Sequence, residues 1–227
     1  MRFSSKRRSP QRRALIEQNA PKRAGTVFSP ESDILDAALR LIAERGVGNV
    51  SLADVGRAVE LPERYLRYHF TDEAALLGAL LNRTYAVSLD MCMRLNRSPH
   101  GPAARVFRAV ADRVMMLGEA DEPLRRLFRA PELRGFDYDV NCPARREFET
   151  WIAERIEDGI ENGEFRKVDT VSSAALVREL ADSGFNADLA PTQSPLRDRA
   201  FAAAEFAVAA LLRDPAALTR IRTSVER

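Results

Sequence analysis

Ten consecutive residues, 61–70 or "LPERYLRYHF", concentrate side chains that can bind phosphate groups and the edges of bases. An arginine can hold a phosphate or a guanine through two parallel hydrogen bonds. Tyrosine and histidine can hydrogen-bond phosphate oxygens, and a glutamate can accept from cytosine N4. The combination indicates nucleic-acid recognition, with an ordinary surface helix of an α-helical protein as the alternative. The candidate residues are Glu63, Arg64, Tyr65, Arg67, Tyr68 and His69.

Catalytic chemistry has little support in the sequence. Of the two histidines, His69 belongs to the stretch above and His100 lies in a Pro/Gly turn. We find no phosphate-binding glycine loop, metal-ligand spacing or nucleophile elbow. Cys92 and Cys142 favour two reduced thiols in a cytosolic protein over a redox switch. We therefore expect no enzymatic activity, no cofactor and no metal site.

Positive charge is concentrated in a basic arm at the start of the chain. Residues 1–24 carry eight Lys or Arg side chains against Glu17 alone, a net +7; because all 227 residues together carry +2, the rest carries −5. A basic arm on an acidic body favours phosphate binding with release of counterions. A solvated tail and a membrane-surface arm are the alternatives. We expect residues 1–28 to form a disordered arm, with DNA contacts from Arg7, Arg8, Lys22 and Arg23.

Short helices must position the stretch "LPERYLRYHF". After a Pro30 start, apolar residues recur at helical spacing up to a "GVG" turn. Ser51 and Asp54 have the spacing of a capping box at the start of a second helix. Pro62 opens a third helix, and residues 72–97 form a long fourth one. Two short helices joined tightly and packed on a first helix predict a helix-turn-helix, whose last helix can enter a DNA major groove.

Residues 34–81, "ILDAALRLIAERGVGNVSLADVGRAVELPERYLRYHFTDEAALLGALL", resemble the N-terminal DNA-binding domain of TetR-type transcriptional repressors. The run "ILDAALRLIAERG", the serine that opens the second helix, and "YHF" followed by an acid and "AALL" carry the resemblance. It implies an all-α fold with a three-helix helix-turn-helix domain at 29–75. A larger helical domain for ligand binding and dimerisation would follow at 76–227. The resemblance also implies that Ser51 lies near the DNA.

Some positions depart from the family's pattern. Glu60 stands where the family usually has a glycine, before the third helix. Glu73 replaces a lysine that often contacts phosphate, and a carboxylate there would repel DNA. We infer that Arg64, Arg67 and the basic arm compensate for this repulsion. The departures are at Ala53, Val59, Glu60, Pro62, Tyr65, Arg67 and Glu73.

The later helices are expected to form an effector pocket and a dimer surface. Apolar interiors of this kind suit small ligands, although plain core packing is the alternative for every candidate. The candidate pocket residues are Met91, Phe107, Met115, Phe128, Phe148, Trp151 and Phe185. Two C-terminal helices with small residues on one side predict a four-helix bundle between protomers, with internal packing as the alternative. The candidate dimer residues are Leu176, Leu180, Ala203, Phe206, Ala207 and Ala210.

Together these features predict a homodimeric repressor that a small molecule releases from double-stranded operator DNA. We expect no membrane association and a cytoplasmic location, because no apolar run reaches the roughly 18 to 20 residues of a membrane span. The alternative is a helical interaction protein with a degenerate helix-turn-helix, whose basic arm binds an acidic partner. The sequence identifies neither the effector nor the operator, nor the sign of control.

Overall fold

The structure is a computed structural model that describes residues 30–136, 138–186 and 194–226. The predicted basic arm, with Arg7, Arg8, Lys22 and Arg23, lies outside the described residues. Within those residues the chain is helical, and its β-structure is one isolated antiparallel bridge between Phe165 and Leu212. The predicted all-α fold is therefore confirmed.

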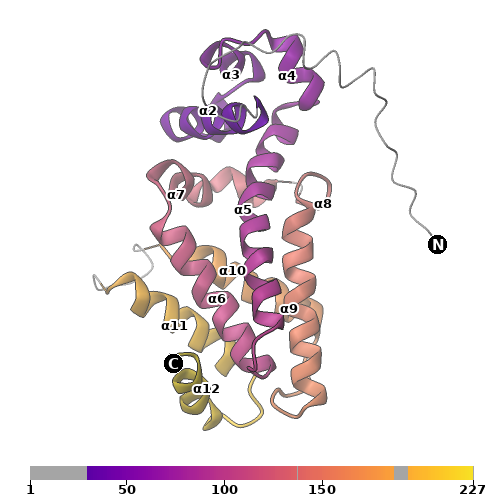
Figure 1. The fold of residues 1–227 in the computed structure, drawn as a ribbon, viewed down its shortest axis with the longest axis vertical. Helices are drawn as coiled ribbons and strands as arrows, with labels where there is room; N and C mark the ends of the chain where they lie inside the picture. Colours follow the sequence, from indigo (N-terminus) through magenta and orange to yellow (C-terminus); the bar gives the residue numbers. More distant parts are fainter. Residues whose placement is uncertain (1–29, 137, 187–193, 227) are drawn as a thin grey trace, which may run out of the picture.

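The first part of the chain is a compact group of helices at one end of the molecule (Figure 1). Gly46 ends α2 because its backbone takes a φ of 89°, a left-handed conformation that favours glycine. The capping box predicted for Ser51 and Asp54 is present at the start of α3. The elements of this part are α2 (Pro30–Arg45), η1 (Val47–Asn49), α3 (Leu52–Ala58) and α4 (Glu63–His69).

The long helix α5 (Glu73–Asn96) belongs to both parts of the molecule. It begins at an Asp72 cap, whose carboxylate accepts a hydrogen bond from the backbone of Ala75 at 2.8 Å. From there it runs away from α2–α4 and into the larger group of helices (Figure 1). The predicted domain boundary between residues 75 and 76 therefore falls inside the first turn of one continuous helix.

The larger part packs around α6 (Pro102–Glu119), which contacts α5, α9, α10 and α11. Pro102 stands in its first turn, where backbone N–H groups have no acceptor within the helix, so proline loses no hydrogen bond there. The apolar side of α6 is fully buried through Val106, Phe107, Val110, Val114 and Leu117. The remaining elements are α7 (Glu122–Arg129), η2 (Pro131–Gly135), α8 (Tyr138–Asn141), α9 (Pro143–Glu161), α10 (Thr170–Ser183), α11 (Leu196–Ala209) and α12 (Ala217–Val225).

Helix α7 is the second connection between the two parts. It lies directly against α2 (Figure 1). The guanidinium of Arg126 donates to the backbone carbonyl of Ala43 at 3.0 Å, near the carboxyl end of α2. A cation there also matches the negative end of the helix dipole. Among the helices of the described segments, none combines the length and apolarity needed to cross a membrane.

Candidate DNA-binding face and effector pocket

Helix α4 presents a polar face because its apolar residues anchor it to the small domain. Leu66 and Phe70 are buried, as their helical spacing predicts. Arg64 is exposed, and it makes no hydrogen bond or ion pair with the described residues. Arg67 is also exposed but pairs with Glu63 one turn earlier, at 2.6 Å. The face therefore offers one unpaired guanidinium and one that a neighbouring carboxylate holds.

Two of the rings of α4 that are candidates for DNA contact, those of Tyr65 and His69, are only partly exposed. Tyr65 is half-buried against the core, and its hydroxyl is buried without a hydrogen-bond partner among the described residues. This burial raises the pKa of Tyr65 above its ordinary value. The His69 ring lies beside the rings of Tyr65 and Tyr68, at centroid distances of 5.0 and 5.4 Å. Of the three, Tyr68 is the exposed one, so Tyr65 and His69 support the helix more than they extend from it.

The turn between α3 and α4 is tight and strained at one residue. Leu61 donates its backbone N–H to the carbonyl of Gly56 at 2.9 Å. A side chain on Gly56 would come within 2.8 Å of the Leu61 carbonyl oxygen. Glu60 takes a φ of 56°, the left-handed conformation that favours glycine. Glu60 thus takes the backbone conformation of the glycine that the family usually has at this position, at a cost of about 1–2 kcal/mol.

The amino end of α3 carries two carboxylates. The Ser51 hydroxyl accepts from the Asp54 backbone at 3.1 Å and donates to its carboxylate at 2.5 Å, so Ser51 acts here as a cap. Hydrogen bonds from Ser51 lower the pKa of Asp54 to about 2. Glu73, at the start of α5, accepts from the Leu52 backbone N–H at 3.1 Å. Helix amino ends commonly bind phosphate through these N–H groups, and Glu73 occupies one of them here.

A buried polar network centred on Asp182 joins α5, α6 and α10. The Arg113 side chain is fully buried and donates to one carboxylate oxygen of Asp182 at 2.9 Å. The Tyr85 hydroxyl donates to the other oxygen, which also accepts from Arg178 at 3.0 Å. Burial alone would raise the pKa of Asp182, but Arg113 and Arg178 outweigh it and hold that pKa below its ordinary value. Asp182 is therefore an ionised carboxylate with three partners.

Aromatic rings enclose the cation of this network. The Arg113 guanidinium carbon lies 4.1 Å from the centre of the Tyr85 ring and 5.1 Å from that of Phe128. A further hydrogen bond reaches the Ser88 hydroxyl at 2.8 Å. The network was not predicted from the sequence, although one signal was present. Arg113 stands three residues after Val110 and four before Leu117, and so interrupts the apolar side of α6.

A pocket of about 580 Å³ opens beside this network, between α7, η2, α9 and α10. Its walls combine two aromatic rings with charged side chains from three helices. Its lining comprises Phe128, Arg129, Ala130, Leu133, Arg145, Arg178, Glu179, Asp182, Ser183, Phe185 and Asn186. Two of the seven predicted pocket residues, Phe128 and Phe185, are among them.

The other five predicted pocket residues lie elsewhere, because the interior is filled by packing. Phe107 stacks edge-on against Phe201 at 5.4 Å. Trp151 donates its indole N–H to the Asn96 side chain at 3.0 Å. Phe148 is fully buried against Tyr85. Met91 and Met115 are half-buried and are not part of the pocket lining.

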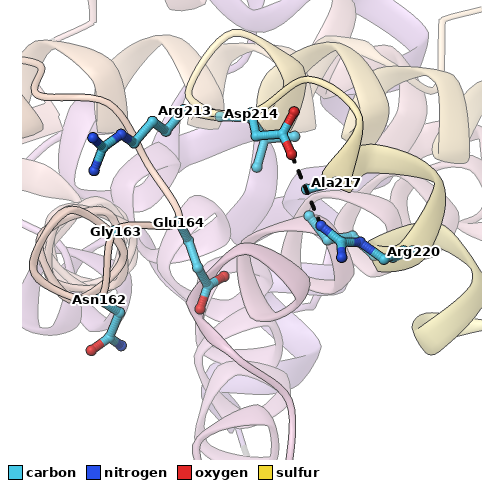
Figure 2. Close-up of a pocket in the computed structure, with 9 residues that line it drawn as sticks. Asn162, Gly163, Glu164, Arg213, Asp214, Ala217 and Arg220 are labelled. Carbon is cyan, nitrogen blue, oxygen red and sulfur yellow. Dashed lines mark ion pairs between the residues drawn. The ribbon is translucent and has the colours of Figure 1, made fainter.

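A second cavity, of about 520 Å³, is shown in Figure 2. It lies at the end of the larger domain that carries α12, far from α7 (Figure 1). The turn after α9, the segment before α12 and α12 itself form it. Its described lining carries two arginines, Arg213 and Arg220, and two carboxylates, Glu164 and Asp214, so the opposite charges are equal in number. Arg220 and Asp214 form a long ion pair of 4.0 Å, and both are exposed. Glu164 accepts from the Ala103 backbone at 3.0 Å and so is engaged in capping α6.

The predicted dimer residues divide into an exposed and an internal set. Leu176 on α10 and Phe206 on α11 are each 68% exposed, and Ala210 is exposed as well. Leu180 and Ala203 are half-buried. Ala207 is only 2% exposed in the single chain, because it faces the protein's own interior on a helix that packs on α6. The burial of Ala207 fits the alternative of internal helix packing that the sequence left open.

Residues 34–80 match the family model described as "Bacterial regulatory proteins, tetR family". No curated protein matches the chain. Among solved structures, the fatty acid degradation regulator FadR from Bacillus halodurans is 17% identical and has a TM-score of 0.65, with 81% of this chain and 97% of that one covered.

A regulatory protein of the tetR family from Rhodococcus RHA1 is 18% identical, with a TM-score of 0.65 and coverage of 83% and 100%. RolR in complex with resorcinol is 17% identical, with a TM-score of 0.62 and coverage of 84% and 91%. These likenesses span the helix-turn-helix and the larger helical part together. Residues 34–80 thus match the tetR family model, and the part of the chain that the structure describes has the fold of TetR-type transcriptional regulators.

Proposed function

We propose that this protein is a ligand-responsive repressor that binds operator DNA as a homodimer. One observation carries the proposal: α5 begins beside the recognition helix α4 and continues to Tyr85 in the buried network next to the pocket. A rearrangement at the pocket therefore has a continuous helical connection to the DNA-binding face. RolR, a protein of similar fold, has been solved with the small molecule resorcinol, which supports a ligand role for the larger domain.

A dimer is part of the proposal because recognition of a two-part operator needs two copies of α4. Half-sites one helical turn apart require recognition helices about 34 to 36 Å apart. The exposed apolar side chains of α10 and α11, Leu176 and Phe206, offer a surface for association. Ligand binding would shift the dimer toward a state with another spacing of its two α4 helices. That shift requires a ligand with different affinities for the two states.

The test is fluorescence anisotropy of the full chain with the DNA upstream of its own gene, beside scrambled DNA of equal length. We expect a preference for the first of about 10³ or more. Arg64→Ala should lower that affinity by about 1–3 kcal/mol and relax the sequence preference, since Arg64 is the unpaired guanidinium of α4. Arg220→Ala, which removes an exposed arginine at the far end of the molecule, is the control.

The contribution of the basic arm is measured in the same assay at two salt concentrations, with and without residues 1–24. Equal and steeply salt-dependent binding to both DNAs would contradict the repressor proposal. It would favour the alternative of a helical interaction protein whose arm binds an acidic partner. The two carboxylates at the amino end of α3, Asp54 and Glu73, are the feature that favours this alternative.

A further inference from the structure

We propose that the pocket between α7, α9 and α10 binds a small organic monocarboxylate with an apolar aromatic or acyl body. The inference rests on the proposed function, since it names the chemical class of the effector. It follows from the charge balance of the pocket, the partners of one arginine and the nature of the walls.

Among the described residues that line the pocket, the arginines outnumber the carboxylates by one. Three guanidinium groups face two carboxylates, those of Glu179 and Asp182. Behind the lining, Arg113 adds one positive charge through its bond to Asp182, and Glu149 adds one negative charge through its bond to Arg178. These two charges leave the balance unchanged. A ligand with a single negative charge would balance the site. The three lining arginines are Arg129, Arg145 and Arg178.

A ligand carboxylate would bind to the guanidinium of Arg178. Its guanidinium contacts Glu149 at 2.8 Å, Asp182 at 3.0 Å and Glu179 at 2.8 Å. Asp182 is held in place by Arg113 and Tyr85, and Glu149 also contacts Arg145 at 3.3 Å.

Glu179 differs from the other two carboxylates because it reaches Arg178 from the solvent. Its side chain is 66% exposed, while that of Arg178 is 10% exposed. An ion pair with such an exposed partner stabilises the fold only slightly, because solvent screens the two charges. A ligand carboxylate can therefore replace Glu179 on Arg178 at small cost. Arg145, on the neighbouring helix α9, can then hold the second ligand oxygen.

The rest of the pocket suits an apolar body. Phe128, Leu133 and Phe185 supply the apolar walls, and the Arg129 guanidinium lies 5.5 Å from the centre of the Phe185 ring. The volume of about 580 Å³ lies within the range of roughly 300–1,000 Å³ that is usual for small-molecule sites. A carboxylate at the arginine side and an apolar body at the aromatic side would fill both halves.

The experiment is isothermal titration calorimetry of the full chain with two matched pairs of probes. These are octanoate with octanamide, and naphthalene-2-carboxylate with naphthalene-2-carboxamide. At least one acid should bind, and it should bind about tenfold or more tightly than its amide, a difference of about 1.4 kcal/mol. The amides keep the shape of the acids and remove the charge, so the ratio isolates the carboxylate.

Two substitutions then test the proposed contacts. Arg145→Gln should weaken binding of the acid about tenfold, whereas Glu179→Gln should strengthen it several-fold by removing the competing carboxylate. Neither should change the affinity of the amide. Arg220→Gln, in the second cavity (Figure 2), removes the same charge elsewhere and should change nothing. Glu179 is exposed and lies outside the buried network, so its variant tests the site even if Arg145→Gln is poorly folded.

The inference is overturned if acid and amide bind equally, if neither pair binds, or if Glu179→Gln weakens the acid. The effect of a bound acid on operator affinity is measured separately by anisotropy. Acid binding with unchanged operator affinity would keep the ligand class and contradict the repressor proposal. If the protein binds operator and a neutral molecule releases it, the repressor proposal is kept and the proposed ligand class is contradicted.

Discussion

Glu73 is the side chain whose position most directly opposes contact with DNA. Its carboxylate occupies the Leu52 N–H at the amino end of α3, where a phosphate could otherwise bind. The negative charge also stabilises the helix end, an effect worth about 0.3–1 kcal/mol. If the small domain binds DNA as proposed, Glu73 lowers the affinity for DNA while it stabilises the small domain.

We expect Glu73→Gln to raise operator affinity several-fold at low salt and to lower the free energy of unfolding by up to about 1 kcal/mol. The amide removes the charge and still offers an oxygen to the Leu52 N–H. Anisotropy measures the first effect and urea denaturation the second. Glu31→Gln, an exposed acid of the first turn of α2, is the control. Unchanged affinity at every salt concentration would show that no phosphate approaches this site.

Asp182 gives a second prediction for a single residue, because removing its charge leaves two buried cations without their anion. Asp182→Asn should lower the free energy of unfolding at pH 7 by about 3–5 kcal/mol, since Arg113 and Arg178 lose their shared anion. Glu179→Gln, which removes an exposed anion of the same cluster, should cost less than about 1 kcal/mol. Urea denaturation at fixed protein concentration measures both.

The same carboxylate gives a pH dependence with a definite sign. Its pKa is lower in the folded protein than the ordinary 3.8. The stability that its charge contributes is therefore complete above about pH 4 and declines as the pH falls through the folded value. The Asn variant should lack this part of the acid-induced loss. Parallel stability curves for both proteins below pH 4 would assign that loss to other groups.

Single residues differ in how far their sequence context reveals their role. Ser51 was predictable as a cap because its partner, Asp54, is three residues away. Glu73 was recognisable only as a departure from a family pattern, since its contact with Leu52 spans 21 residues. Arg113 could be suspected from its place on an apolar helix face, but its partner Asp182 lies 69 residues further on. Pairings of this range are set by tertiary packing, which no local pattern encodes.

Elements were predicted well wherever a cap or a break is local. The predicted helix at 72–97 corresponds to α5 (Glu73–Asn96), and α9 (Pro143–Glu161) packs against it. The joint between them could not be predicted. Asn82 of α5 accepts from the Ala144 backbone at 3.0 Å and donates to the Asn141 carbonyl at 3.3 Å, so a side chain of one helix caps another. Gly78, one turn earlier, lets the Asn141 backbone approach closely.

We expect Gly78→Ala to destabilise the protein by about 1–3 kcal/mol, because the new methyl group would lie 2.2 Å from the Asn141 carbonyl oxygen. Helix propensity alone predicts the opposite, a gain of about 1 kcal/mol. The sign of the change in urea denaturation therefore decides between the two. Gly118→Ala is the control, since it meets the end of the Leu196 side chain, which can move. A stabilised Gly78→Ala protein would refute the close packing of α5 on this joint.

At the scale of the whole molecule, α10 and α11 carry large apolar side chains that no part of the described chain covers. Leu176 and Phe206 are large and exposed on two helices that contact each other. Large exposed apolar side chains on such helices make them candidates for an association surface. The sequence pattern drew attention to the alanines of α11, but small residues suit close packing inside one chain equally well, as Ala207 shows.

We expect Leu176→Glu and Phe206→Glu each to convert a dimer into monomers, because a buried carboxylate without a partner is costly at an interface. Analytical ultracentrifugation measures the change, and operator affinity should fall with it. Met93→Glu, on an exposed methionine of α5, is the matched control. Dimers that persist in both variants would place the interface on another face.

The length of α5 has a consequence for how little the larger domain needs to move. Its 24 residues make a rod of about 36 Å, since each residue of an α-helix adds about 1.5 Å. A tilt of roughly 5° about one end displaces the other end by about 3 Å, close to the 3.4 Å rise of one base pair. If the carboxyl end of α5 stays fixed, Tyr85 lies about halfway along the helix and moves about half as far as the end beside α4. Under the proposed function, a ligand-induced shift of Tyr85 would therefore be roughly doubled at the recognition helix.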